Sequence, residues 1–231
     1  AEFKPVQAKA DEPTDLNEGG MTPQTVNAYN KPLNNEIVFP AAILQPALFD
    51  ANSDDASNYG AIGAVIGHEI THGFDDEGRQ FDASGTLRDW WTTEDASKYD
   101  NEAGRIRDQY SAYLVSDTFH VNGKLTLGEN IADFGGLKIA YAAFEKAMTG
   151  KSRAPVDGFT PEQRFFIAYA NAWRSKDRPE IQILHSRTDP HSPNKWRVIG
   201  ALSNLPEFAQ AFGCKAGDPM VRADSVRATI W

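Results

Sequence analysis

The sequence predicts an α+β domain that is mainly α-helical and contains a small sheet. Apolar side chains recur at the three- and four-residue spacing of a helix in several long segments. The clearest strand signal is the short run 36–39, and Pro40 restricts this strand to the edge or the end of a sheet. With 231 residues, of which 41% are hydrophobic, the chain can bury a core as one sizeable domain or two small ones.

The first expected helix follows this strand and runs over about 59–74. Gly78 and Gly85 then mark turns. The aromatic pair Trp90–Trp91 is expected to pack against neighbouring side chains. A second helix is expected to begin at Thr93, because apolar side chains recur at helical spacing after it. These positions are Ala96, Tyr99, Ala103, Ile106, Tyr110 and Tyr113.

Three further helices are expected in the second half of the chain. The first covers 130–148, where apolar residues again recur at helical spacing. The second opens at 160–163, whose sequence TPEQ forms a capping box with proline in the first turn. The third is short, with Ser203 or Asn204 expected as its N-terminal cap and Gly213 as its end.

Residues 1–20 differ in composition from the rest of the chain. They are polar and charged, include proline and glycine, and have few residues that could enter a core. Such a composition predicts a flexible arm or linker. The folded domain is therefore expected over 21–231.

The run His68–His72, with sequence HEITH, is typical of a zinc-dependent hydrolase. Residues four apart share one face of an α-helix, so both imidazoles can reach one metal ion. Glu69 can then act as general base toward a water that the metal activates. The preceding residues 61–67 are small and apolar, which suits a buried helix that holds the ligands rigidly. The alternative is a helix that merely carries two histidines.

A catalytic zinc site requires a third protein ligand and leaves its fourth position open for water. The best candidate is Glu129, in the run 128–133 with sequence GENIAD. Glu129 and Asp133 lie one helical turn apart, so one carboxylate can bind zinc while the other accepts the free ring N–H of a ligand histidine. An acidic pair at this spacing is also common on solvated helices, but the apolar, glycine-flanked setting favours the metal site.

Several long motifs in one order resemble the neprilysin and endothelin-converting-enzyme family of zinc peptidases. The resemblance covers nearly everything from Met21 to Trp231. Besides the histidine run, it is carried by Val26–Tyr29, Ile37–Pro46, Asn58–Gly60, Gly73–Asp76, Trp90–Trp91, Gly128–Gly136, Asp189–Pro193 and Arg197. The resemblance implies a thermolysin-like catalytic domain, one zinc ion per chain, and peptides as substrates.

The resemblance also implies roles for the residues at the metal. His68, His72 and Glu129 match the family's zinc ligands, and Glu69 matches its catalytic base. Asp133 matches the carboxylate that orients one ligand histidine.

Further roles follow from the same resemblance. Asp75 resembles the carboxylate that orients the other histidine, although a turn aspartate that caps local backbone is a rival interpretation. His191 matches the donor of a hydrogen bond to the tetrahedral oxyanion, with Asp189 as its charge partner. Without the family context, His191 is more simply a loop histidine in a proline-rich turn. Arg197 resembles the side chain that grips a substrate carbonyl.

Substrate contacts are implied as well. Asn27 and the Ala28 backbone resemble the edge that binds the peptide main chain. An apolar pocket for the side chain just after the scissile bond is implied at Ile43, Leu48, Val65 and Trp173, although all four are ordinary core residues on composition alone. The chain departs from the family at Leu48, where an aromatic residue is common, and at Asn30, where a second tyrosine is common.

Composition excludes several classes of partner and location. A net charge of −9 argues against nucleic acid, whose phosphates require a basic surface. No apolar run is long enough for a membrane span, and no signal peptide opens the chain. The single cysteine, Cys214, excludes an intrachain disulfide and is expected to be a small buried thiol. Animal members of the family have disulfides, so the chain resembles a bacterial member. We expect a periplasmic or secreted location, with the cytoplasm as the alternative.

The sequence therefore predicts a zinc endopeptidase or oligopeptidase that cleaves short peptides on the amino side of hydrophobic residues. The helical N-terminal domain that covers the active-site cavity in the family is not found in this chain, so it is a fragment, a trimmed product or a natural short form. A truncated, weak or inactive fragment that binds zinc and peptide is one alternative, and a domain in which the motifs only pack is another. The missing half also predicts self-association through exposed apolar surface.

Overall fold

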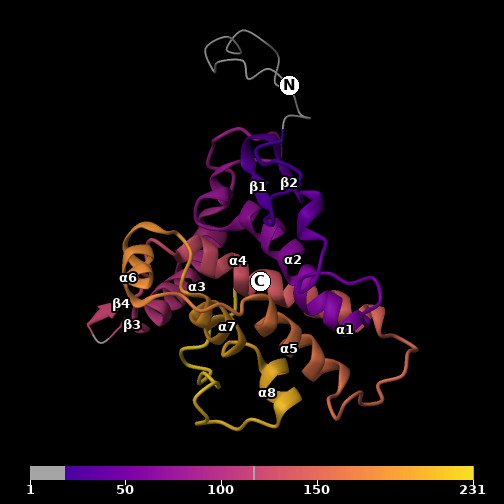
Figure 1. Cartoon of the computed structure of the whole chain (residues 1–231). Coiled ribbons are helices and arrows are strands. Elements are labelled where there is room, and N and C mark those ends of the chain that lie inside the picture. Colours follow the sequence, from indigo (N-terminus) through magenta and orange to yellow (C-terminus); the bar gives the residue numbers. More distant parts are fainter. Residues whose placement is uncertain (1–18, 117, 231) are drawn as a thin grey trace.

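The computed structural model describes residues 19–116 and 118–230, so most of the predicted arm, residues 1–18, lies outside the described residues. The helices are α1 (Asp55–Asn58), α2 (Ala64–Thr71), α3 (Thr93–Ser111), α4 (Leu127–Ala147), α5 (Pro161–Ala172), α6 (Pro179–Thr188), α7 (Asn194–Leu202) and α8 (Pro206–Phe212). The strands are β1 (Tyr29–Lys31), β2 (Glu36–Val38), β3 (Leu114–Ser116) and β4 (Phe119–His120). A narrow N-terminal lobe with β1 and β2 stands on a broader helical body, and α2 and α4 lie near the junction (Figure 1).

The strands form two separate two-stranded antiparallel sheets in the described part of the chain. In the first sheet, Tyr29 of β1 lies opposite Val38 of β2. In the second, Leu114 of β3 lies opposite His120 of β4. The predicted strand at 36–39 is therefore present as β2, while the second sheet was not expected. The mainly helical class with a minor sheet component is confirmed.

The predicted helix at 59–74 is a helical run of several segments. It begins with α1, whose N-cap Asp54 accepts a hydrogen bond from the backbone N–H of Ser57. A π-helical turn over Tyr59–Gly63 follows, then α2, and a 3-10 turn over His72–Phe74 ends the run. His68 lies in α2 and His72 at the start of the 3-10 turn, so the two imidazoles remain one helical turn apart.

Helix α4 crosses α2 with the two backbones in direct contact. A Cβ added to Gly67 of α2 would lie under 3.0 Å from the carbonyl of Gly136 in α4. In the reverse direction, a Cβ on Gly136 would lie under 3.0 Å from the backbone N–H of His68. Only glycine permits so close an approach. As a result, the histidines of the α2 segment come within reach of Glu129, at the start of α4.

Most predicted helix boundaries are confirmed. Thr92 caps α3 by accepting a hydrogen bond from the N–H of Asp95, and the capping box of Thr160 and Gln163 opens α5. Helix α4 begins three residues before the expected position, at Leu127. Gly213 ends α8 with a φ of 65°, in the left-handed region that favours glycine.

The predicted N-terminal cap of α8 is wrong. Neither Ser203 nor Asn204 caps this helix, whose N-cap is Leu205 without a side-chain hydrogen bond. The buried Asn204 amide is used in tertiary contacts instead. It donates to Gln109 Oε1 at 2.8 Å and accepts from the N–H of Ala228 at 3.0 Å, which joins α3 to the C-terminal segment.

Aromatic side chains form much of the core of the helical body. Rings from α4 and α5 pack on one another at centroid distances of 5.2–5.3 Å, and they belong to Tyr141, Phe144, Phe165 and Phe166. Trp91 packs edge-on against Tyr99 at 5.3 Å, as expected for a packing aromatic. Trp90 is more exposed, and its indole N–H donates to the Phe81 carbonyl.

None of the helices in the described part of the chain combines the length and apolarity that a membrane span requires. Cys214 is only partly buried, in contrast to the buried thiol that was expected. It follows the glycine that ends α8, and its backbone N–H donates to the Ala209 carbonyl at 2.8 Å.

Candidate metal centre

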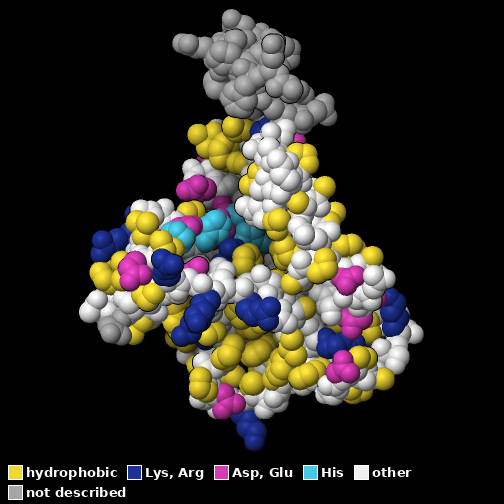
Figure 2. Space-filling view, viewed as in Figure 1, with side chains coloured by type: hydrophobic (Ala, Val, Ile, Leu, Met, Phe, Trp, Pro, Cys, Tyr) yellow, Lys and Arg dark blue, Asp and Glu magenta, His cyan; other side chains and the backbone are white. Residues whose placement is uncertain are grey.

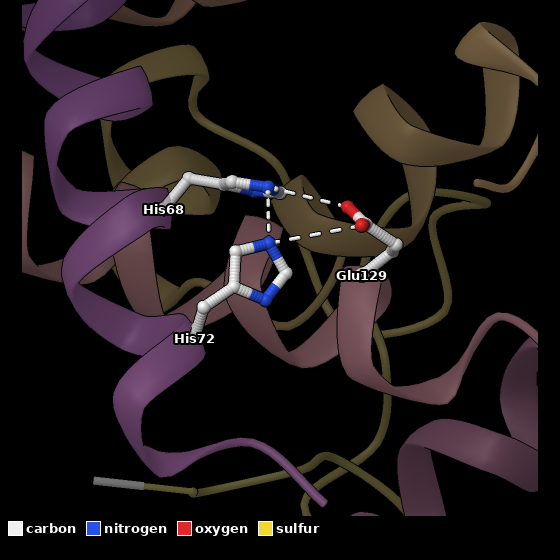
Figure 3. A group of neighbouring side chains, drawn as sticks. All are labelled: His68, His72 and Glu129. Atoms are coloured by element: carbon white, nitrogen blue, oxygen red, sulfur yellow. Dashed lines mark hydrogen bonds and ion pairs between the residues drawn. The ribbon is translucent and has the colours of Figure 1, made fainter. Parts of the chain in front are cut away.

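Three side chains converge at the junction of the lobe and the helical body. His68 Nε2 lies 3.0 Å from His72 Nε2 and 3.2 Å from Glu129 Oε2 (Figure 3). His72 Nε2 lies 3.7 Å from Glu129 Oε1. In a tetrahedral zinc site, ligand atoms at about 2.0–2.2 Å from the ion lie about 3.3–3.6 Å from one another. The three predicted ligand residues are thus brought together at separations of 3.0–3.7 Å, close to this spacing.

The far ring nitrogen of each histidine meets a carboxylate. His68 Nδ1 lies 2.9 Å from Asp133 Oδ1, and His72 Nδ1 lies 2.7 Å from Asp75 Oδ2. A carboxylate only accepts hydrogen bonds, so Nδ1 carries the proton and Nε2 of the neutral ring presents a lone pair. Both Nε2 lone pairs then point at the same place.

This donor set fits a zinc ion. When both rings are neutral, their Nε2 lone pairs face and repel one another at 3.0 Å, and the buried Glu129 Oε2 then has no hydrogen-bond donor. A cation between these atoms removes the repulsion and supplies the missing partner. Two imidazole nitrogens and one carboxylate oxygen are a zinc donor set that leaves one position open. Such N/O sites also accept other divalent metals.

Burial and charge shift the pKa values of the ligands in opposite directions. Burial opposes protonation of His68, but the carboxylates of Asp133 and Glu129 outweigh it and raise the pKa of His68 to about 9. Burial alone would raise the pKa of Glu129, yet the neighbouring His68 and His72 lower it to about 2. Glu129 is therefore ionised at neutral pH, while without metal a proton occupies His68 there. Metal binding must displace this proton.

Glu69, the predicted base, is buried directly beside the first ligand. Burial raises its pKa above the ordinary value, partly opposed by the charges of His68 and His72. Its backbone carbonyl accepts a hydrogen bond from Asn30 Nδ2 at 2.9 Å. Asn30 lies in β1 of the lobe, so this bond joins the lobe to the helix that carries Glu69.

Asp75 makes the contacts that both interpretations of its role require. Its Oδ2 faces His72 Nδ1, whereas its Oδ1 accepts hydrogen bonds from the backbone N–H groups of Glu77 at 2.9 Å and Gly78 at 2.7 Å. The turn after the histidine helix is thus closed by the same carboxylate that contacts His72 Nδ1. The two expectations were rivals on the sequence, but one side chain has enough acceptor sites for both.

Arg197 is buried and forms a two-pronged pair with Asp133. Its Nε donates to Asp133 Oδ2 and its Nη2 donates to Oδ1, each at 2.7 Å. Its guanidinium also lies 3.7 Å from the centroid of the Trp173 ring, a cation–π arrangement. The positive charge of Arg197 lowers the pKa of Asp133, against the effect of burial. Arg197 therefore supports the carboxylate that orients His68, and its predicted grip on a substrate carbonyl stays a prediction.

His191 lies close to the metal ligands although it comes from a distant loop. Its Nε2 is 3.3 Å from Glu129 Oε1, and its Nδ1 is 2.7 Å from Asp189 Oδ1. The loop joins α6 to α7, and 44% of the His191 side chain is exposed. The His191 ring thus lies beside Glu129, with its Nδ1 hydrogen-bonded to Asp189.

A cavity of about 620 Å³ contains the three ligands, Glu69 and His191. It also contains every residue predicted to contact substrate, namely Asn27, Ala28, Ile43, Leu48, Val65, Trp173 and Arg197. Figure 2 shows histidine side chains gathered in a hollow between the lobe and the helical body. Ala28 and Ile43 are buried in a small hydrophobic cluster that Leu48 and Val65 join. These residues therefore line the cavity and also pack in a small core. The two interpretations, a substrate pocket and ordinary core packing, are compatible for this cluster.

Two polar residues near the site were not predicted from the sequence. Ser192 Oγ donates to Asn130 Oδ1 at 2.8 Å, and both residues are buried. They directly follow His191 and Glu129 within the motifs already identified. Their position next to His191 and Glu129 was the only sequence feature that pointed to them. Their contact with one another joins residues 62 positions apart, so it depends on the fold.

Comparison with known proteins agrees with the geometry. The model of peptidase family M13 matches residues 27–228. Neprilysin-3 of Drosophila melanogaster is 45% identical over 216 residues, which are 92% of this chain and 27% of that protein. Neprilysin-1 of Caenorhabditis elegans is 50% identical over 212 residues, which are 89% of this chain and 28% of that protein.

Solved structures give the same result. The zinc metalloprotease ZMP1 of Mycobacterium tuberculosis, in complex with an inhibitor, superposes with a TM-score of 0.94 at 46% sequence identity. That superposition covers 97% of this chain and 35% of the ZMP1 chain. The chain thus spans about a quarter to a third of the length of these relatives. The family match over most of its length, together with its histidine, glutamate and carboxylate geometry, shows that the chain belongs to peptidase family M13.

Proposed function

We propose that the chain is the catalytic domain, over 21–231, of a zinc endopeptidase or oligopeptidase that cleaves on the amino side of hydrophobic residues. The observation that carries this proposal is the convergence of His68, His72 and Glu129 in one cavity with the buried carboxylate of Glu69. Family membership supports the same reaction class, since the similar ZMP1 structure is that of a zinc metalloprotease. The expected cofactor is one zinc ion per chain.

The chemistry divides between the metal and the residues of the chain. Zinc in this site would supply a Lewis acid that polarises water and the scissile carbonyl. Glu69 takes the proton of the attacking water and then delivers it to the leaving amine. Its buried setting raises its pKa, which brings it closer to the neutral pH at which a carboxylate is an effective base.

His191 acts on the oxygen of the scissile carbonyl. As the carbonyl carbon becomes tetrahedral, negative charge grows on that oxygen, and a donor held in place beforehand stabilises it. His191 Nδ1–H donates to the Asp189 carboxylate at 2.7 Å, and Nε2 lies 3.3 Å from Glu129 Oε1. The doubly protonated ring also carries a proton on Nε2, which is the donor to the oxyanion. Arg197 contributes mainly through Asp133, while a further N–H of its guanidinium remains for a substrate carbonyl.

Substrate binding follows from the cavity wall. Asn27 and Ala28 immediately precede β1, whose described pairing is with β2 on one side. An extended peptide can add main-chain hydrogen bonds along such a strand edge. The cluster of Ile43, Leu48 and Val65 forms the apolar wall that favours a hydrophobic side chain just after the scissile bond.

The alternative function is a fragment that binds zinc and peptide with little or no turnover. It is supported by the share of the relatives that the chain spans, about a quarter to a third. For an isolated domain of this kind, we propose weak binding of substrates that include larger peptides. We also propose self-association through apolar side chains on the lobe that are exposed, such as Val26, Leu33 and Leu44. Sedimentation as a monomer at all concentrations would contradict the association.

Peptides are the partners that this proposal requires, and no feature of the site favours nucleic acid. An extracytoplasmic location in a bacterium stays a prediction. Fractionation of cells that express the full natural protein would test it.

The deciding experiment measures cleavage of a quenched fluorescent peptide that contains Phe or Leu, by the zinc-loaded chain and its Glu69→Gln variant. We expect cleavage that stops on chelation and returns with zinc, and a loss of about 100- to 10,000-fold in Glu69→Gln. Zinc content should be equal in both proteins, and the exposed Glu94→Gln on α3 is the matched control. Folded, zinc-loaded protein that binds the peptide without cleaving it would favour the alternative.

A further inference from the structure

The loop that carries His191 is attached to helix α4 through the next residue, Ser192. The side chains of His191 and its partner Asp189 are 44% and 33% exposed, so solvent reaches their ion pair. An exposed pair of this kind does not hold a loop rigidly. Ser192, in contrast, is only 2% exposed, and its hydroxyl donates to Asn130 Oδ1 at 2.8 Å.

Asn130 is fully buried and immediately follows the metal ligand Glu129 in α4. Its Nδ2 donates to Thr126 Oγ1 at 2.9 Å, and Thr126 Oγ1 donates to the Asn122 carbonyl at 3.1 Å. Because the Thr126 hydroxyl proton is used there, this hydroxyl must accept from the Asn130 amide nitrogen. The amide oxygen therefore faces Ser192, and all three hydrogen bonds run in one direction.

We propose that Ser192 and Asn130 are positioning residues that hold His191 at the oxyanion position. The hydrogen-bonded chain from Asn122 to Ser192 fastens the loop to the same helix that presents Glu129. The position of the His191 loop relative to Glu129 is therefore set within one buried network. Pro190 and Pro193 on either side restrict the loop backbone further. This inference rests on the proposed function, because it assigns His191 to the oxyanion.

The test compares Ser192→Ala with Ser203→Ala in the zinc-loaded chain. Ser203 is an equally suitable control, since it is also a buried serine whose hydroxyl is hydrogen-bonded, to the Gly200 carbonyl at 3.1 Å, away from the His191 loop. Affinity is measured by calorimetry for a phosphinic peptide, which presents a tetrahedral anion, and for a thiol peptide with the same side chains, which does not. Ser192→Ala should weaken binding of the phosphinic peptide about tenfold. This loss is smaller than the roughly 100-fold effect of removing a whole oxyanion donor. The affinity for the thiol peptide should change by less than about twofold in Ser192→Ala. Ser203→Ala should change the affinity for neither peptide.

A double variant separates positioning from a general structural effect. Because Ser192 acts through His191, Ser192→Ala should cause no further loss of phosphinic peptide affinity in a His191→Ala background. Ser192→Thr, which keeps the hydroxyl, should restore the affinity. Additive losses in the double variant, or equal behaviour of Ser192→Ala and Ser203→Ala, would overturn the proposal.

Hydrogen exchange distinguishes failure of this inference from failure of the proposed function. If the folded, zinc-loaded chain binds neither peptide, the proposed function fails. The attachment of the loop is then measured by the hydrogen exchange rates of the backbone amides in residues 189–193. Faster exchange in Ser192→Ala than in Ser203→Ala supports the anchor, and unchanged exchange refutes it.

Discussion

Both histidines of the candidate metal site have a carboxylate on Nδ1, but the two carboxylates differ in their other contacts. Asp75 closes a backbone turn through its second oxygen. Asp133 is shared between His68 and Arg197 and is almost completely buried. Replacing either residue is therefore expected to affect the candidate metal site. Only loss of Asp133 removes both hydrogen bonds of the buried Arg197 guanidinium, whose other carboxylate neighbour, Glu129 Oε2, lies 3.7 Å away.

For Asp133→Asn, we expect zinc affinity to fall about 10- to 100-fold, because the oriented tautomer of His68 loses its carboxylate. The free energy of unfolding should also fall by about 3 kcal/mol or more, since Arg197 becomes a buried charge without its ionised partner. Chelator competition and urea denaturation measure the two effects. Asp100→Asn, in an exposed pair with Arg79, should change neither. Unchanged zinc affinity in Asp133→Asn would contradict this role.

The raised pKa of His68 predicts how stability of the metal-free chain depends on pH. A pKa of about 9 in the folded state, above the ordinary histidine value of 6.5, means that protonation of His68 stabilises the fold. This contribution is fully present below about pH 6.5 and is lost as the pH rises through about 9. We expect the metal-free chain to lose on the order of 1–3 kcal/mol of stability between these values.

Urea denaturation at pH 6.5 and 9.5, with and without zinc, checks this expectation. The zinc-loaded chain should show a smaller loss, because the metal takes the place of the proton. Equal pH dependence of both forms would show that His68 is not the group responsible.

At the scale of elements, the contact between α2 and α4 determines whether a metal site exists. The ligands come from segments more than fifty positions apart, and the crossing at Gly67 and Gly136 brings their backbones together. A side chain at either glycine would push the helices apart, because the atoms in the way belong to backbone that cannot rotate aside.

Gly67→Ala should therefore destabilise the domain by about 3 kcal/mol or more and weaken zinc binding. Gly104→Ala is the matched control, because a Cβ there meets nothing closer than 3.8 Å, on the flexible Arg107 side chain. As an alanine inside helix α3, it should stabilise by about 0.5–1 kcal/mol. Thermal denaturation and zinc titration of both variants check the pair. A Gly67→Ala protein with wild-type stability would show that the crossing relaxes more easily than the structure indicates.

At the scale of the molecule, the cavity lies at the junction between the lobe and the helical body. Asn27, Ala28 and Ile43 reach it from the lobe, whereas Trp173, His191 and Arg197 reach it from the body. A ligand in this junction binds only when both parts are in place. Zinc, which would join the α2 segment to α4, is therefore expected to stabilise the whole domain.

We expect saturating zinc, at about 1,000 times its Kd, to add about 4 kcal/mol to the free energy of unfolding. For a domain of this size, this corresponds to a rise in Tm of about 8–16 °C. Calorimetric scans with zinc and with excess chelator measure the difference. His72→Ala should abolish most of the rise, because the ion loses one of its three protein ligands. A rise that persists in His72→Ala would place the stabilising zinc elsewhere.

The sequence by itself determined the local features and, through its motifs, the residue types of the site. The spacing of His68 and His72 depends only on the helical repeat, and the capping box at Thr160 and the left-handed Gly213 depend on neighbouring residues. Such features need no knowledge of distant segments. Helices α6 and α7 were not predicted, because they have no capping box and no long apolar repeat that would indicate them locally.

Only the tertiary structure decided how these local pieces combine. Arg197 pairs with Asp133 across 64 positions, Ser192 with Asn130 across 62, and Asn204 with Gln109 across 95. A buried polar group must find a partner, but nothing within a few residues of it specifies which one. That choice is made when the helices pack, so the predicted cap at Asn204 was wrong and the anchor of His191 was not foreseen.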